Sequence, residues 1–364
     1  MIFVVLPNGR LFLLGLLSIS IKLTERIRAQ SYMILRNKNI KRIFKYIIAP
    51  VLGIWLFYSL YQQIQSQPDL DQSLAVIKDA PFGAQAWKFW SVILMVFINW
   101  GLEARKWQIL IHPIQKMNYT TAYKSVLTGV TLSINTPNRI GEYGGRILYV
   151  KDGSRIKAVS VYIAGSISQL IITLIMGCLG LLYLLNYQMK PDDTIMGLSY
   201  FWVETLLILS IFIGMLMILF FFRLSWLVKL VEKIPAMEKY VHYINVLEAF
   251  NPKLLLRLLS LSLFRYITFV LQYILLLQVL NVPILWFEGF PIISILFLVM
   301  AVIPSFAIAD LGIRGKFSTA LLGIYSSNQV GIIGTTFGIW FINLFIPALL
   351  GSILILSIKF FNEK

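Results

Sequence analysis

The stretch "NTPNRIGEYGGR", from Asn135 to Arg146, places two arginines, a glutamate, a proline and three glycines inside a very apolar chain. The hydrocarbon core of a membrane normally excludes both charges and non-helical backbone. The residues just before it have helical character, and Pro137 then removes a backbone donor. Lys124 and Lys151 flank the region on its two sides, so the segment should enter and leave on one face. We therefore predict a re-entrant helical hairpin.

The composition around this stretch indicates an all-α polytopic membrane protein. Of the 364 residues, 58% are hydrophobic and 13% are charged, which is more apolar surface than a soluble domain of this length can bury. We expect a single membrane domain over 44–358, between an N-terminal segment 1–43 and a short tail 359–364. The six predicted spans cover about 44–61, 87–110, 158–185, 201–222, 254–280 and 330–358.

The beginning of the chain does not resemble the rest. Its apolar run from Leu11 to Ile21 is too short to span a membrane, and it lacks the basic region of a signal peptide. Met33 then opens a basic segment of the kind that often begins inner-membrane proteins. We therefore expect native translation to start at Met33, with the preceding residues either a start-site artefact or a tail that lies on the membrane surface.

The net charge of +16 is better explained by membrane orientation than by nucleic acid, which we do not expect as a partner. With the basic clusters inside, both termini are cytoplasmic and the location is the bacterial inner membrane. Residues 224–251 alternate charged and apolar groups, which predicts an amphipathic helix on the cytoplasmic membrane surface. The basic clusters are 36–45, 105–124, 151–157 and 223–257, and the acid-leaning loops are 62–86 and 187–200.

A second irregular stretch, "IPSFAIADLGIRGKF" from Ile303 to Phe317, repeats part of the first. Both contain an acid-x-Gly-x-Arg pattern, and a proline precedes each acid. The chain then divides into halves 44–185 and 201–358, each with an odd number of crossings, so the second half is inverted. Paired interrupted segments in inverted repeats indicate a site near the membrane midplane. A chance match of a short pattern in a glycine-rich chain is the competing explanation.

The candidate binding residues come from these two hairpins. Arginine offers a planar fork of donors that suits phosphate, and nearby acids can pair with it when the site is empty. Glycine and proline allow tight turns and close backbone approach. The predicted substrate-binding residues are Arg139, Glu142, Arg146, Asp310 and Arg314. The predicted hairpin backbone residues are Pro137, Gly141, Gly144, Gly145, Pro304 and Gly312.

We expect Arg146 and Arg314 to converge on one cavity, with Glu142 and Asp310 close by. Simpler interpretations stay open: a cytoplasmic loop, a structural Glu142–Arg146 pair, and an interfacial anchor at Arg314. A separate cluster of three charges lies near the end of the second predicted span, and we interpret it as interfacial only. Its members are Glu103, Arg105 and Lys106.

The residues that bind metals are scarce. The chain has one cysteine, Cys178, and two histidines, His112 and His242, and they form no cluster in the sequence. We expect no metal and no cofactor. The common hydrolase and metalloenzyme motifs are missing from the sequence too, so we do not expect an enzyme.

The segment "TPNRIGEYGGRILYV" resembles the Pro-x-x-x-Gly-Glu-x-x-x-Arg region of the lysylphosphatidylglycerol synthase transmembrane region family, also called flippase-like or YbhN-like. "PSFAIADLGIRGKF" resembles its second signature, although Gly315 stands where the family often has glutamate. The resemblance covers roughly residues 40–360 and implies lipid translocation. It does not extend to the family's soluble aminoacyl-transferase domain, so we do not expect synthesis of lysyl-lipid. The positions carried over are Pro137, Arg139, Gly141, Glu142, Arg146, Pro304, Gly312 and Arg314.

Three functional hypotheses follow. The first is a flippase-like transporter that moves an anionic phospholipid or lipid-linked headgroup through a central arginine-lined cavity. The second is a membrane enzyme that acts on lipid headgroups, with Glu142 as a general acid or base. The third is a non-catalytic membrane partner of a glycosyltransferase or lipid-synthesis enzyme, which docks on residues 224–251.

Overall fold

The computed structural model describes residues 58, 62, 70–134, 136, 139–195, 197–233, 238–303 and 307–362. The predicted N-terminal segment 1–43 with Met33, and the first predicted span apart from Tyr58, lie outside the described residues. Pro137 and Pro304 also lie outside them, and of Asp310 only the backbone is described. The fold below is that of the described residues, which belong to one compact unit beginning at Leu56.

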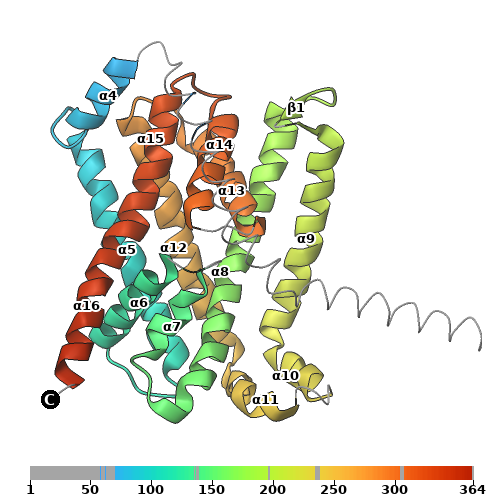
Figure 1. Ribbon diagram of the computed structural model, residues 1–364. Coiled ribbons are helices and arrows are strands. Elements are labelled where there is room, and N and C mark those ends of the chain that lie inside the picture. The colour runs from blue at the N-terminus through green and yellow to red at the C-terminus, as the bar shows by residue number, and fades with distance from the viewer. Residues whose placement is uncertain are drawn as a thin grey trace, which may run out of the picture. The chain divides into compact units, whose positions relative to one another are not determined.

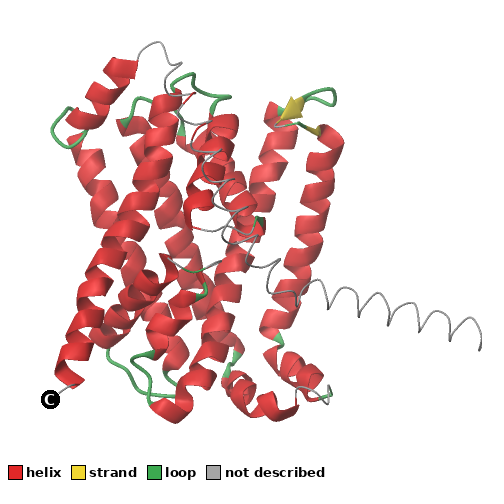
Figure 2. Ribbon diagram, in the orientation of Figure 1, coloured by secondary structure: helices red, strands yellow, loops and turns green. Residues whose placement is uncertain are grey.

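Figure 2 shows that nearly all of the described chain is helical. Among the described residues, four helical segments are long and apolar enough to cross a membrane: 152–188, 200–222, 252–279 and 329–354. They agree closely with four predicted spans. The long helices are α5 (Ala86–Ile111), α8 (Arg155–Tyr183), α9 (Tyr200–Phe222), α12 (Pro252–Val279), α15 (Gln329–Trp340) and α16 (Ile346–Asn362).

Two of these helices end in, or continue through, a wider turn. A π-helical turn, Leu184–Gln188, follows α8, and a second one, Phe341–Phe345, joins α15 to α16. The π turn is rare, occurs mostly as a single turn inside an α-helix, and is frequent at functional sites. The second turn contributes to the candidate site below.

The shorter elements lie at the two ends of the long helices (Figure 1). Helix α4 (Leu70–Asp79) occupies a stretch that the sequence indicated only as a polar loop, and its Val76 packs against the apolar core. Strands β1 (Thr194–Ile195) and β2 (Leu198–Ser199) form a small antiparallel hairpin. The opposite end carries the 3-10 turn Asp152–Ser154, α10 (Leu224–Glu232), α11 (Glu238–Ile244) and the 3-10 turn Asn245–Ala249.

Both irregular stretches form pairs of short helices. The first pair is α6 (Tyr119–Ile134) and α7 (Gly141–Ile147), and the second is α13 (Trp286–Val302) and α14 (Ala307–Leu322). In Figure 1 the α6–α7 pair lies toward the end that carries α10 and α11, and the α13–α14 pair lies toward the end with β1. The two pairs are therefore displaced toward opposite ends of the bundle.

The two halves of the chain pack on each other reciprocally. Helix α5 packs along α12, α8 packs on α13, and α16 packs on α6. A side chain at Gly180 of α8 would meet the carbonyl oxygen of Pro291 in α13 at 2.5 Å. A side chain at Gly351 of α16 would likewise collide with the carbonyl of Leu127 in α6. The last long helix of each half thus closely approaches the first short helix of the other half.

Candidate functional site: a buried ion network beside an arginine-bearing pocket

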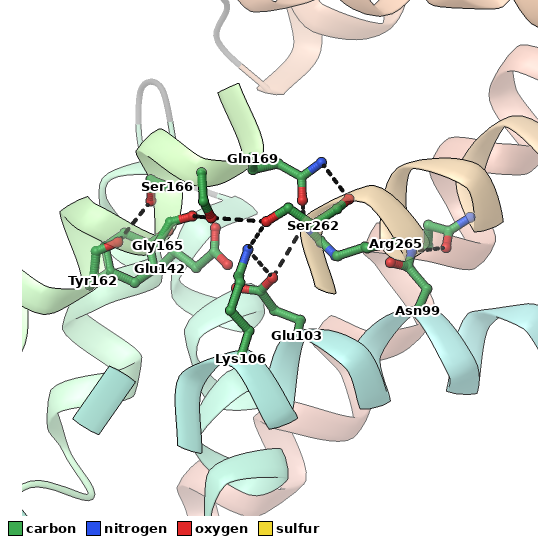
Figure 3. A network of polar contacts seen from close by, with 12 residues as sticks. Asn99, Glu103, Lys106, Glu142, Tyr162, Gly165, Ser166, Gln169, Ser262 and Arg265 are labelled. Carbon is green, nitrogen blue, oxygen red and sulfur yellow. Dashed lines mark hydrogen bonds and ion pairs between the residues drawn. The ribbon is translucent and has the colours of Figure 1, made fainter. Parts of the chain in front are cut away.

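Glu103 of α5 is the centre of a buried ion network (Figure 3). Its carboxylate lies 2.9 Å from Lys106 Nζ, 2.9 Å from Arg146 Nη2 and 3.4 Å from Arg265 Nη1. Glu103, Lys106 and Arg146 are only 5%, 3% and 1% exposed. Charges buried this deeply persist only when they are paired, and here one carboxylate is shared by three cations.

Helix α5 buries these charges because they lie on its inner face. Glu103 and Lys106 are one turn apart, and Trp100 and Trp107 beside them are 3% and 0% exposed. Arg105, which points away from this face, is exposed and donates to Gln108. The interpretation of all three charges as interfacial is therefore wrong for Glu103 and Lys106. Sequence reasoning missed one signal. Glu103 and Lys106 recur at helical spacing with Trp100 and Trp107, which places all four side chains on the same face of α5.

Arg146 joins the first hairpin to this network. It pairs with Glu142 one turn earlier on α7, and its guanidinium carbon lies 4.7 Å from the ring of Tyr162 and 5.6 Å from that of Trp107. Its Nε and Nη1 are buried and have no hydrogen-bond partner among the described residues. The paired Glu142–Arg146 structure that the sequence allowed is present, and Glu103 adds a second carboxylate to it.

The glycines of the hairpin allow α7 to reach this position. A Cβ at Gly145 would lie 2.5 Å from the Cα of Gly129, so α6 and α7 cross in backbone contact. A Cβ at Gly144 would meet only the side chain of Leu132, at 3.9 Å. Of these neighbouring glycines, Gly145 is the one that the close crossing requires.

The network extends to α8 and α12 through neutral side chains. Lys106 Nζ donates to Ser262 Oγ at 3.5 Å, and Ser262 shares a hydrogen bond of 2.9 Å with Ser168. Arg265 Nη1 donates to Gln169 Oε1 at 3.5 Å. Among the described side chains the network holds three cations and two carboxylates, so it carries one positive charge in excess.

A pocket of about 310 Å³ adjoins the network. Arg139 in the turn of the first hairpin, Arg265 of α12 and Arg314 of α14 all contribute to its wall. Arg139 has a φ of 57°, a left-handed conformation that costs energy in a non-glycine residue and is often found at functional sites. The remaining wall residues are Trp100, Gln169, Thr173, Tyr266, Phe269, Phe297, Met300, Ala301, Ile339, Trp340, Asn343 and Leu344.

The π turn between α15 and α16 also reaches the pocket. Asn343 lies in this turn, lines the pocket and accepts a hydrogen bond of 3.2 Å from Asn99 of α5. Neither asparagine was singled out by sequence reasoning. Both belong to predicted spans, where a single polar residue has no distinguishing local pattern.

The predicted site residues therefore fall into two adjoining places. Arg139 and Arg314 line the pocket, whereas Arg146 and Glu142 belong to the ion network, and Arg146 is not among the residues that line the pocket. Arg265, which the sequence did not single out, contacts Glu103 and also lines the pocket. Within the described part of the chain, no three His, Cys, Asp or Glu side chains are grouped so as to hold a metal ion.

The family comparison covers all of these elements. The sequence model described as "Lysylphosphatidylglycerol synthase TM region" matches residues 43–351, most of the chain. The chain belongs to this family. A comparison with curated proteins found no match. As a lysylphosphatidylglycerol synthase TM region protein with long apolar helices, it is a multi-pass membrane protein, and both hairpins, the ion network and the pocket lie within the matched region.

Proposed function

We propose that this protein is a lipid translocase, which moves an anionic phospholipid or lipid-linked headgroup through the pocket between its two hairpins. The observation that carries the proposal is the pocket wall, in which three arginines from different parts of the fold stand beside aromatic and aliphatic side chains. Guanidinium groups bind phosphate oxygens through paired hydrogen bonds. The apolar part of the wall suits the glycerol and acyl portions of a lipid.

The membrane arrangement that we propose has six spans, two re-entrant hairpins from opposite faces, and cytoplasmic termini in a bacterial inner membrane. The displacement of α6–α7 and α13–α14 toward opposite ends supports it, because inverted halves require that arrangement (Figure 1). The reciprocal packing of α8 on α13 and of α16 on α6 supports a two-fold relation between the halves. The end that carries α10 and α11 is then the cytoplasmic one.

We propose that the contacts of the ion network change when an anion binds in the pocket. Arg265 lies between Glu103 and the pocket, so a phosphate in the pocket competes with Glu103 for this guanidinium. Such competition is strong at low dielectric, where each unpaired charge is costly. We propose that headgroup binding weakens the Arg265–Glu103 contact and strengthens the hold of Glu103 on Arg146. This would couple the pocket to the first hairpin.

The proposal is tested with purified full-length protein in vesicles that contain phosphatidylglycerol with a fluorescent acyl chain. Loss of fluorescence to a membrane-impermeant quencher measures the lipid that has moved between leaflets. We expect faster movement than in protein-free vesicles, and slower movement for Arg314→Gln. Arg257→Gln removes the same charge from an exposed position of α12 and should change nothing. Wild-type vesicles no faster than protein-free ones would refute translocation.

The same preparation separates the two other hypotheses. A chemically altered lipid, detected by mass spectrometry, would indicate a membrane enzyme. A chain that moves no lipid but purifies with a glycosyltransferase or lipid-synthesis enzyme would indicate a partner protein.

A further inference from the structure

A cluster of three buried hydroxyl groups joins three helices of the second half. The hydroxyl oxygen of Tyr273 in α12 lies 3.0 Å from that of Ser318 in α14 and 2.6 Å from that of Thr336 in α15. The three residues are 2%, 0% and 2% exposed. Thr336 donates its single proton to the carbonyl of Ile332, so Tyr273 donates to Thr336 and Ser318 donates to Tyr273. The Tyr273 hydroxyl therefore links α14 to α15.

This hydroxyl cluster lies directly beside the pocket. Each of its members is four residues, about one helical turn, from a pocket-lining residue on the same helix. Residues four apart lie on the same face of a helix, so the cluster fixes the faces that form this part of the pocket wall. The pairs are Phe269 and Tyr273 on α12, Arg314 and Ser318 on α14, and Trp340 and Thr336 on α15.

The ring of Tyr273 also contacts the other helix of the second hairpin. It meets the ring of Phe297 in α13 edge to face, at a centroid distance of 6.3 Å, and Phe297 lines the pocket as well. The helices α12, α13, α14 and α15 pack on one another, and Tyr273 contacts the other three from α12. One buried side chain thus connects every helix that the second half contributes to this end of the pocket.

We propose that Tyr273 is a positioning residue for lipid binding, because its hydroxyl holds α14 against α12 and α15 and so sets the place of Arg314 in the pocket wall. This role rests on the proposed function, since it concerns the same pocket. Arg314 has contacts of its own within the protein, and Tyr273 acts on the helix that carries it. A binding group is effective when supporting hydrogen bonds and packing hold it in its productive geometry.

Binding is measured by native mass spectrometry of the full chain with phosphatidylglycerol. We expect Tyr273→Phe to weaken binding by about threefold to tenfold, the factor that one buried hydrogen bond supplies. Tyr187→Phe removes a hydroxyl from a residue that is 75% exposed and should preserve binding. In a protein that already carries Arg314→Gln, Tyr273→Phe should weaken binding no further, because Tyr273 acts through Arg314. Unchanged binding by Tyr273→Phe, or losses that add in the double variant, would overturn the positioning role.

Two variants of Thr336 test the same contact with the tyrosine left in place. Thr336→Val removes the acceptor of Tyr273 and should reproduce the loss of binding. Thr336→Ser keeps the hydroxyl and should bind as the wild-type protein does. Equal losses in the two variants would show that the shape of the side chain matters and the hydrogen bond does not.

The translocation assay described above separates the positioning role from the proposed function. If binding depends on the hydroxyl cluster while no lipid moves between leaflets, translocation fails and the positioning role stands. If the wild-type and Tyr273→Phe proteins bind and move lipid equally, translocation stands and the positioning role fails. If the wild-type protein neither binds nor moves phosphatidylglycerol, both fail.

Discussion

At the scale of single residues, Glu103 has the most unusual environment, because three cations share its one carboxylate within the interior. The pairing offsets a large desolvation penalty for each ion. Removing the carboxylate leaves its partners buried and uncompensated, which is more costly than losing an exposed ion pair.

We expect Glu103→Gln to lower the free energy of unfolding by about 3–5 kcal/mol, measured as loss of thermal stability in detergent. Glu248→Gln, at an exposed position, should have little effect. Adding Arg265→Gln to Glu103→Gln should cost less than Arg265→Gln costs alone, because the two residues interact. Additive losses would show that Glu103 and Arg265 act independently.

Arg146 should not tolerate lysine, although the charge is kept. Glu142 and Glu103 both contact Arg146 through the same nitrogen, Nη2, so lysine can keep these ion pairs but loses the planar guanidinium that lies against the ring of Tyr162. We expect Arg146→Lys to slow translocation by about tenfold or more, the equivalent of one desolvated cation–π contact. Arg155→Lys, in the surface pair with Asp152, is the matched control and should retain full activity. If Arg146→Lys is as active as the wild-type protein, only the positive charge of Arg146 is needed for translocation.

At the scale of elements, the α6–α7 hairpin depends on a crossing too close for side chains. Gly145 meets Gly129 at backbone distance, while its neighbour Gly144 has room. These adjacent glycines in one short helix differ only in what a methyl group would contact. Alanine substitutions at the two positions therefore separate the effect of steric crowding on stability from the effect of helix propensity.

We expect Gly145→Ala to destabilise the protein by about 1–3 kcal/mol, because α6 and α7 must move apart. Gly144→Ala should be neutral or slightly stabilising, since alanine favours helix and its Cβ is accommodated. Thermal unfolding of the two variants in the same detergent gives the comparison. Equal losses at both positions would show that the crossing is looser than described.

At the scale of the whole molecule, the proposed topology assigns opposite sides to the two ends of the bundle. Lys151 and Asp192 are both exposed, and they precede and follow the long helix α8. In a Cys178→Ser background, we expect a membrane-impermeant thiol reagent outside the cell to label Asp192→Cys. It should label Lys151→Cys only after the membrane is opened. External labelling of Lys151→Cys in intact cells would show that this residue is not cytoplasmic, and the proposed topology would be wrong.

Most of the helices and the interruptions between the paired short helices were predictable because their causes are local. Apolar length marks α8, α9, α12 and the α15–α16 segment, and proline with glycine marks the interruptions. The helix α4 was missed because it is short and lies in a polar stretch. The family was also recognisable, since its first signature is contiguous in the sequence from Thr136 to Val150 and the family match contains it.

The ion network was decided only by the tertiary structure. Glu103, Arg146 and Arg265 lie far apart in the chain, on α5, α7 and α12, and no local pattern relates them. Whether a charge near a helix end is interfacial or buried depends on which helices pack over it. The sequence determined that arginines and acids occur at helix interruptions in a membrane protein. Packing then placed Arg314 at a pocket and Arg146 in a network, with Arg265 between them, because burial and pairing are set by neighbours that are distant in the sequence.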